Sequence, residues 1–193
     1  DDYRKSSVDH KLAKVVDYWK LKELGSIFVC LKYYWRNIMS RNESNLFRIT
    51  IKPDSKIGKA FDFCQEKSIV GVGWKLWSTD GTLYVPKHIW DCEEAGRRCY
   101  PKSRGFVTAI HCLGRMKLDD LIWTRNNGIY YLCRVTGSWE YHDEPEYLNK
   151  DLENVISVEF NEVGTVDEVP GKVVNSFRSG SSIQGIHSEI ALN

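Results

Sequence analysis

The 193-residue sequence lacks any long apolar run. No stretch of about 18 consecutive apolar residues occurs, and no positively charged leader precedes a shorter one, so the sequence shows neither a membrane span nor a secretory signal. The chain starts at Asp1 rather than Met, and a leader removed earlier would leave no trace. We therefore expect, by default, a cytoplasmic protein without a membrane partner.

Known catalytic motifs are also missing. The nucleophile elbow GxSxG, the phosphate loop GxxxxGK[ST], HExxH and GxGxxG are all absent. A metal-dependent nuclease would need converging carboxylates, for which Asp119 with Asp120, or Asp143, Glu144 and Glu146, are the candidates. We interpret the first pair as the opening of a strand and the second group as a solvated loop.

The six cysteines, at positions 30, 64, 92, 99, 112 and 133, show no CxxC spacing. Cys92, Cys99, His111 and Cys112 form the one cluster to weigh as a metal site, but none of its pairs has the usual ligand spacing. Because several cysteines lie in apolar runs, we interpret them as buried thiols. Nor does His111-Cys112 resemble an activated nucleophile, since cysteine in an apolar helix is usually inert. We expect no enzyme activity, metal or cofactor.

Charge is divided along the chain, although the net charge is only +1. Residues 1–60 carry 13 Lys/Arg and 7 Asp/Glu, residues 61–137 carry 11 and 8, and residues 138–193 carry 3 and 11. A partner bearing phosphates would favour the first two segments. Two solvated faces of opposite sign would give the same division.

The sequence pattern divides the chain into three parts. Residues 1–45 show helical spacing of apolar residues on both sides of Gly25, which predicts an N-terminal helical hairpin. Residues 46–179 carry strand and helix patterns typical of one α+β domain. Residues 180–193 are expected to be a loosely ordered tail.

Within the middle part, alternation predicts strands at 46–52, 69–74 and 154–160, with Arg48 on the polar side of the first. Helices are expected at 57–65, from Pro86 to Gly96, and from Phe106 to Arg115.

The clearest local pattern is the hairpin from Asp119 to Val135. Asn127-Gly128 lies between two apolar runs and supplies the two positive-φ residues of a type I′ turn. In this register Arg125 faces Tyr130 and Trp123 faces Leu132.

Several aromatic residues fall at strand ends or in turns: Trp74, Trp77, Trp123, Trp139 and Tyr141. Such rings either close the ends of a small barrel or line a pocket for a flat ligand. A nucleobase stacks on an aromatic ring with about 1 to 3 kcal/mol.

The segments FRITIKPDS, SIVGVGW, MKLDDLIWTR, GIYYLCRVTGSW and ENVISVEF, in this order, resemble the PUA superfamily of pseudo-barrels, and within it the EVE and YTH-like domains. The resemblance covers roughly residues 46–175 and rests on short motifs. It implies a small twisted mixed β-barrel with flanking helices.

The resemblance also implies a reader of methylated or hydroxymethylated bases, which would accept a flipped or single-stranded base in an aromatic cage. Bacterial examples are associated with modification-dependent restriction and antiviral defence. Trp74 matches the cage Trp of YTH-like domains, with Trp77 close behind, and Trp139 falls where a second cage Trp is expected. The implied base pocket thus contains Trp74, Trp77, Trp139, Trp123, Asp54 and Ser55.

Asp54 stands where YTH-like readers often have Asn, and an acid suits a base edge that presents an amino donor. Lys75, Arg125 and Arg178 are the candidates for backbone phosphates. Two other hypotheses stay open. In the first, the chain is a protein-interaction or adaptor domain that binds a partner, an effector or a second copy, through its acidic last third or its N-terminal helices. In the second, it is a metal-dependent nuclease.

Overall fold

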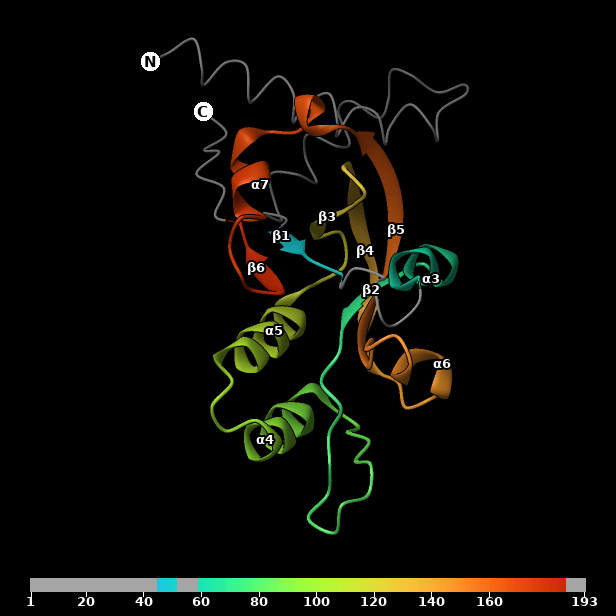
Figure 1. Cartoon of the computed structure of the whole chain (residues 1–193), viewed down its shortest axis with the longest axis vertical. Helices are drawn as coiled ribbons and strands as arrows, with labels where there is room; N and C mark the ends of the chain where they lie inside the picture. The colour runs from blue at the N-terminus through green and yellow to red at the C-terminus, as the bar shows by residue number, and fades with distance from the viewer. Residues whose placement is uncertain (1–44, 52–58, 187–193) are drawn as a thin grey trace.

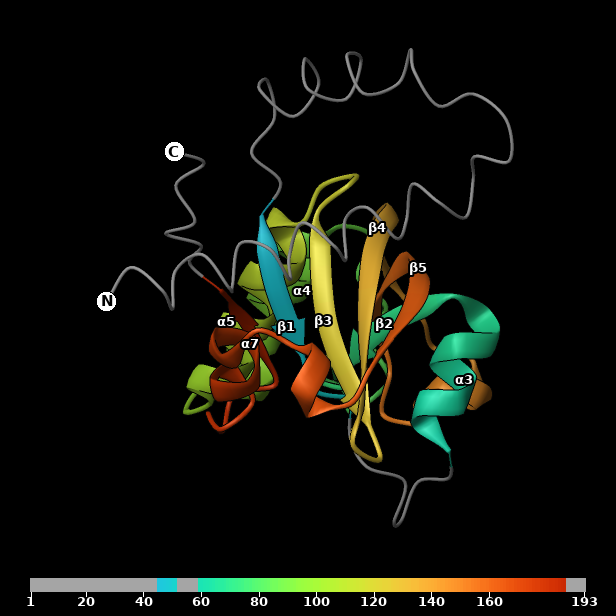
Figure 2. The same ribbon diagram turned by 90° about the horizontal axis from the view of Figure 1, so that it is seen from above.

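The computed structural model describes residues 45–51 and 59–186. These residues form a mixed α+β fold, in which a six-stranded sheet curls into a half-barrel and helices pack around it (Figures 1 and 2). The expected N-terminal helical hairpin and the last seven residues, 187–193, lie outside the described residues.

In chain order the elements are β1 Leu46–Ile49, α3 Ala60–Lys67, β2 Ile69–Val72, α4 Ile89–Cys99, α5 Arg104–Arg115, β3 Leu121–Asn126, β4 Ile129–Tyr141, α6 Pro145–Leu148, β5 Asn154–Gly164, the 3-10 turn η1 Val166–Glu168, α7 Gly171–Ser176 and β6 Ile183–Gly185.

The strand order is β2-β5-β4-β3-β1-β6. β1 runs parallel to β3, and the other neighbouring pairs are antiparallel. A register shift between Val135 and Trp139 interrupts the pairing of β4 with β5. Bulges of this kind bend a strand and increase its twist, which accounts for the curl of the sheet. The edges of the sheet are β2 and β6.

The β3–β4 hairpin has the predicted register. Arg125 pairs with Tyr130 and Trp123 with Leu132. Asn127 and Gly128 have φ angles of 49° and 83°, as a type I′ turn requires. This part of the sequence prediction is confirmed.

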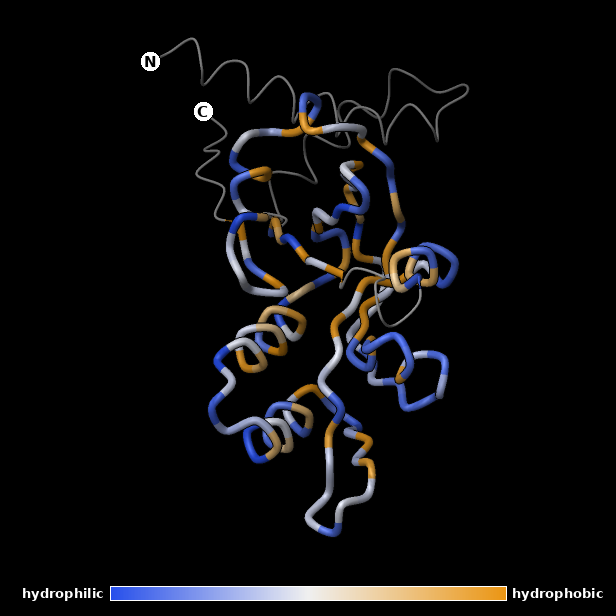
Figure 3. The backbone as a smooth tube through the Cα atoms, in the orientation of Figure 1, coloured by the Kyte–Doolittle hydropathy of each residue, from blue (hydrophilic) through white to orange (hydrophobic). Residues whose placement is uncertain are grey.

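Both faces of this hairpin are covered. On one face, Ile122 and Cys133 join the main core, which α3, α4 and α5 complete. On the other, Trp123 and Leu132 pack with Phe177 in a second core cluster beneath α7. Hydrophobic residues accordingly follow the strands and one side of α4 and α5, whereas α6 is mostly hydrophilic (Figure 3).

The structure differs from the expected ends at all three helices, and α5 begins at Arg104 rather than at Phe106. α4 begins at Ile89 rather than at Pro86, because the Asp91 carboxylate accepts the backbone N–H of His88 at 3.2 Å and caps the helix there. α3 begins at Ala60 and runs to Lys67, and Ala60, Phe61, Phe63 and Cys64 are its buried residues.

The sheet also extends beyond the expected domain end at residue 179. Residues 183–185 form β6, which pairs with β1 through Ile183 and Ile49, and Ile186 N–H donates to the Leu46 carbonyl at 2.7 Å. The first part of the expected loose tail is therefore an edge strand of the sheet. A second difference is that Arg48, expected on a polar face, is fully buried.

Candidate ligand pocket

A pocket of about 440 Å³ lies where the two edges of the half-barrel approach each other. One wall is β2 with the segment after it, and the opposite wall comes from the end of β1 and the start of β6. The volume lies in the range of small-ligand sites. The lining residues are Thr50, Gly71, Val72, Gly73, Trp74, Lys75, Trp77, Tyr100, Asp151 and Ser182.

The segment 73–77, which follows β2, is held mainly by side-chain hydrogen bonds. The Asn154 amide donates to the Gly73 carbonyl at 2.8 Å, and Tyr100 Oη donates to the Lys75 carbonyl. The backbone N–H of Leu76 donates to Tyr141 Oη at 3.2 Å. Irregular backbone fixed in this way can hold side chains at defined positions around a ligand.

Trp74 has a φ of 92°, which is strained for a bulky residue. Its ring makes edge contacts with Tyr100 and Phe106, at centroid distances of 5.1 and 5.6 Å. A Cβ atom at Gly105 would lie 3.8 Å from the indole, so the start of α5 also borders this ring. The surrounding rings thus fix an unfavourable backbone conformation and place the indole in the pocket wall.

Trp77 is the exposed aromatic side chain of the pocket, with 48% of its surface accessible. It lies on a narrow ribbon in which Trp77 pairs with Leu83, and which projects away from the sheet below β2 (Figure 1). Its backbone N–H donates to Cys99 Sγ at 3.2 Å. An exposed indole on a tethered ribbon offers a surface on which a flat ligand can stack.

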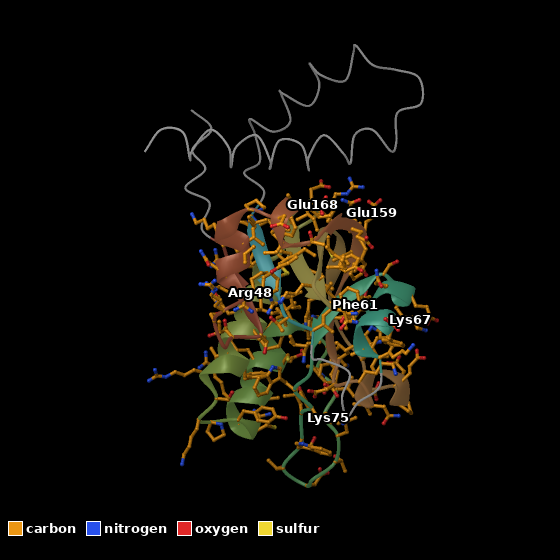
Figure 4. All side chains as sticks on the ribbon, turned by 45° about the horizontal axis from the view of Figure 1, so that its top comes forward. Arg48, Phe61, Lys67, Lys75, Glu159 and Glu168 are labelled. Carbon is orange, nitrogen blue, oxygen red and sulfur yellow. The ribbon has the colours of Figure 1, made fainter. Side chains whose placement is uncertain are left out.

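Charged groups of both signs lie at the pocket. Lys75 lies on the segment after β2 (Figure 4), and its Nζ is 4.0 Å from the carboxylate of Glu153, which is fully buried. Burial, followed by the charges of Cys99, Glu153 and Asp151, raises the pKa of Tyr100, so this hydroxyl stays a neutral donor.

The structure brings three of the residues predicted for the site to this pocket: Trp74, Trp77 and Lys75. Two other predicted residues, Asp54 and Ser55, lie outside the described residues.

Trp139 and Trp123 do not line the pocket. Trp139 packs against the main core, and its indole N–H donates to Asn154 Oδ1 at 3.3 Å, so it supports the residue that holds Gly73. Trp123 is fully buried in the second core cluster. Trp123 pairs with Leu132, as the sequence predicts, but α7 covers this face of the hairpin. Stacking of a ligand on Trp123 is therefore not supported.

The two predicted phosphate-binding arginines also lie elsewhere. Arg125 stacks over the Phe177 ring at 5.0 Å, near the turn of the hairpin. Arg178 is exposed just after α7 and is not a lining residue.

The sequence reasoning missed Tyr100, Asp151, Thr50 and Ser182, all of which line the pocket. Tyr100 lies after the predicted helix, which ends at Gly96, and directly before Pro101, and an aromatic residue in a turn between helices was the available indication. The other three show no local pattern, since only the tertiary fold brings them to the pocket.

No family model and no curated protein matches this chain. The pocket must therefore be interpreted from its own chemistry. Its lining combines three aromatic rings, a lysine and a carboxylate around a space open to solvent on the Trp77 side.

Three of the carboxylates considered for a nuclease, Asp120, Glu144 and Glu146, have structural partners. Asp120 accepts the backbone N–H groups of Asn45 and Lys117 at 2.8 and 2.9 Å, which joins the starts of β1 and β3. Glu144 contacts His142 at 3.0 Å, and Glu146 pairs with Lys67 at 3.2 Å. Across residues 45–51 and 59–186, no three His, Cys, Asp or Glu side chains are grouped to hold a metal ion.

The candidate thiol nucleophile Cys112 is half-buried on α5, and burial raises its pKa. A raised pKa keeps the thiol protonated and makes it a poorer nucleophile.

Among residues 45–51 and 59–186, no helix has the length and apolar character needed to cross a membrane.

Proposed function

We propose that this chain is a nucleic-acid-binding module, with the PUA-like pseudo-barrel architecture of EVE and YTH-like domains, that takes a single modified base into the pocket beside Trp74 and Trp77. The observation that carries the proposal is the convergence of two indoles and the Tyr100 ring on one open pocket of about 440 Å³. Aromatic rings that line a pocket offer surfaces on which a base can stack.

The distribution of basic side chains supports a nucleic acid rather than an isolated base. Lys75 lines the pocket, Lys102 is exposed on the turn after Tyr100, and Arg104 is exposed at the start of α5. Neither Lys102 nor Arg104 forms an ion pair within the described part of the chain, so both are available to phosphates. The geometry therefore favours Lys75, Lys102 and Arg104 as phosphate contacts over Arg125 and Arg178.

The cost of taking a base out of a stack is a few kcal/mol, and it is smallest for a base that is already unpaired. Stacking at about 1 to 3 kcal/mol per base offsets much of this cost. A methyl or hydroxymethyl group adds apolar contact with the indoles, which would favour the modified form. A sensor for restriction or defence is the biological role that such binding would serve.

The proposal is tested with single-stranded oligonucleotides that carry one methylated base, by fluorescence anisotropy over a series of salt concentrations. Trp77→Ala should weaken binding about 5- to 100-fold, because it removes one stacking surface from a half-exposed position. Affinity should fall as salt rises, because phosphate contacts release counterions.

The matched control is Trp90→Ala, since Trp90 is 62% exposed but does not line the pocket. If both substitutions weaken binding equally, or if neither does, the pocket is not the binding site. A partner retained after nuclease treatment, with no oligonucleotide binding, would instead favour the protein-interaction hypothesis.

A further inference from the structure

Asp151 places a carboxylate in the pocket wall in an unusual way. Its φ is 55°, in the left-handed region, at the end of the turn that leads from α6 to β5. A Cβ atom at Gly73 would lie 2.0 Å from Asp151 Oδ1 and 2.7 Å from Oδ2. The carboxylate therefore occupies the space that any side chain at position 73 would need, directly beside Trp74.

Only hydrogen-bond donors are suitable partners for this group. An ionised carboxylate is an acceptor with about four lone-pair sites, so contacts with the protein leave capacity for a ligand. Asp151 lines the same pocket as the rings of Trp74, Trp77 and Tyr100, which brings an acceptor to the wall where a flat ligand would stack.

The Lys75 ammonium does not change the preference of the Asp151 carboxylate for hydrogen-bond donors. The Lys75 ammonium is 4.0 Å from the buried Glu153 carboxylate, which attracts it toward the protein. Lys75 is thus partly balanced by Glu153, and Asp151 is the carboxylate that lines the pocket itself. The negative charges of Glu153 and Asp151 also reach Tyr100, whose pKa they help to raise after burial, the larger cause.

We propose that Asp151 selects bases whose edge carries an exocyclic amino group, the cytosine and adenine class, over bases with a carbonyl at that position. This inference rests on the proposed function and names the class of base that the pocket accepts. A carbonyl edge would place two acceptors against each other, and such a mismatch is costly in a partly desolvated site.

The test uses two isosteric pairs, each within an otherwise identical single-stranded oligonucleotide: 5-methylcytosine against thymine, and adenine against hypoxanthine. Within each pair, the replacement of the amino group by a carbonyl also changes the protonation of the neighbouring ring nitrogen. For the pair whose ring size the pocket accepts, the wild-type protein should bind the amino member at least about tenfold more tightly.

The informative variant is Asp151→Asn. Asn tolerates the left-handed conformation at this position and has the same size, so the fold should be kept, which thermal unfolding checks. Its amide can donate or accept, and the preference should fall to within about threefold. Asp143→Asn, an exposed residue outside the pocket lining, is the control and should keep the wild-type preference.

The outcomes separate the two claims. If Trp77→Ala weakens binding but wild type binds both members equally, or the carbonyl member better, the base pocket stands and the role of Asp151 is overturned. Retention of the full preference by Asp151→Asn overturns it as well. If no oligonucleotide binds, the proposed function fails, and the inference fails with it.

Discussion

At the scale of single residues, Arg48 is notable because it carries a positive charge into the interior. Its hydrogen-bond acceptors in the described part of the chain are neutral oxygens: Nη1 donates to Thr50 Oγ1 at 3.1 Å, and Nη2 donates to Ser181 Oγ at 2.9 Å and to Gln184 Oε1 at 3.2 Å. Burial, then the charge of Arg125, lowers the pKa of Arg48. Arg48 therefore fastens the β6 edge to β1, next to two residues of the pocket wall, Thr50 and Ser182.

Arg48→Met should lower the free energy of unfolding by about 2 to 4 kcal/mol, because it removes several hydrogen bonds from a buried guanidinium to partly buried oxygens that hold β6 to β1. Arg125→Met is the matched control, since Arg125 contacts the same Phe177 ring from an exposed position and should cost less than about 1 kcal/mol. Urea denaturation measures both values. Equal losses in the two variants would show that Arg48 does not fasten the edge strand.

Burial also controls the reactivity of the Cys92 thiol. Burial, with a smaller contribution from the charge of Glu93, raises its pKa to about 12, and its Sγ donates to Asn154 Oδ1 at 3.2 Å. Only the thiolate reacts with alkylating reagents. We therefore expect that iodoacetamide at pH 8 labels the partly exposed Cys99 before Cys92 in the native protein. Peptide mass spectrometry checks this order, and early labelling of Cys92 would contradict the described packing.

At the scale of elements, the β3–β4 hairpin was predictable because its determinants are local. The turn needs positive φ at Asn127 and Gly128, and both residues are adjacent in the sequence. The helix ends were less predictable. α4 starts where Asp91 can cap it, whereas Pro86 lies three residues before Ile89.

Gly128→Ala tests the turn directly. A Cβ atom at Gly128 meets nothing within 4 Å, so only the φ of 83° opposes the substitution, at a cost of about 1 to 2 kcal/mol. Gly171→Ala is the control, because position 171 is equally open but begins α7 without a positive φ. Its effect on thermal unfolding should be close to zero. A Gly128→Ala variant as stable as wild type would contradict the assigned turn.

The burial of Arg48 between β1 and β6 could not be predicted from local sequence patterns. Alternation predicts Arg48 on a polar face, and that face would be exposed in an isolated strand. The serine-rich segment 179–182 and β6 bring neutral oxygens to this face. The burial of Arg48 depends on contacts such as its hydrogen bond to Ser181, which is 133 residues away in the sequence. A local sequence pattern contains no information on such a contact.

At the scale of the whole molecule, the pocket depends on the closure of the half-barrel. Its lining comes from segments around residues 50, 71–77, 100, 151 and 182. The sequence predicted Trp74, Trp77 and Lys75, which are neighbours along the chain. It did not predict Tyr100, Asp151 or Ser182, because their positions relative to Trp74 are set by how β2, β5 and β6 are placed in the fold.

The most direct measurement of the central claim is the affinity of the wild-type protein for two single-stranded oligonucleotides that differ only in one methyl group on one base. We expect salt-sensitive binding of both oligonucleotides, tighter binding of the methylated one, and loss of this difference in Trp77→Ala but not in Trp90→Ala. Equal affinity of the wild-type protein for both oligonucleotides, across every methylated base tried, would contradict it.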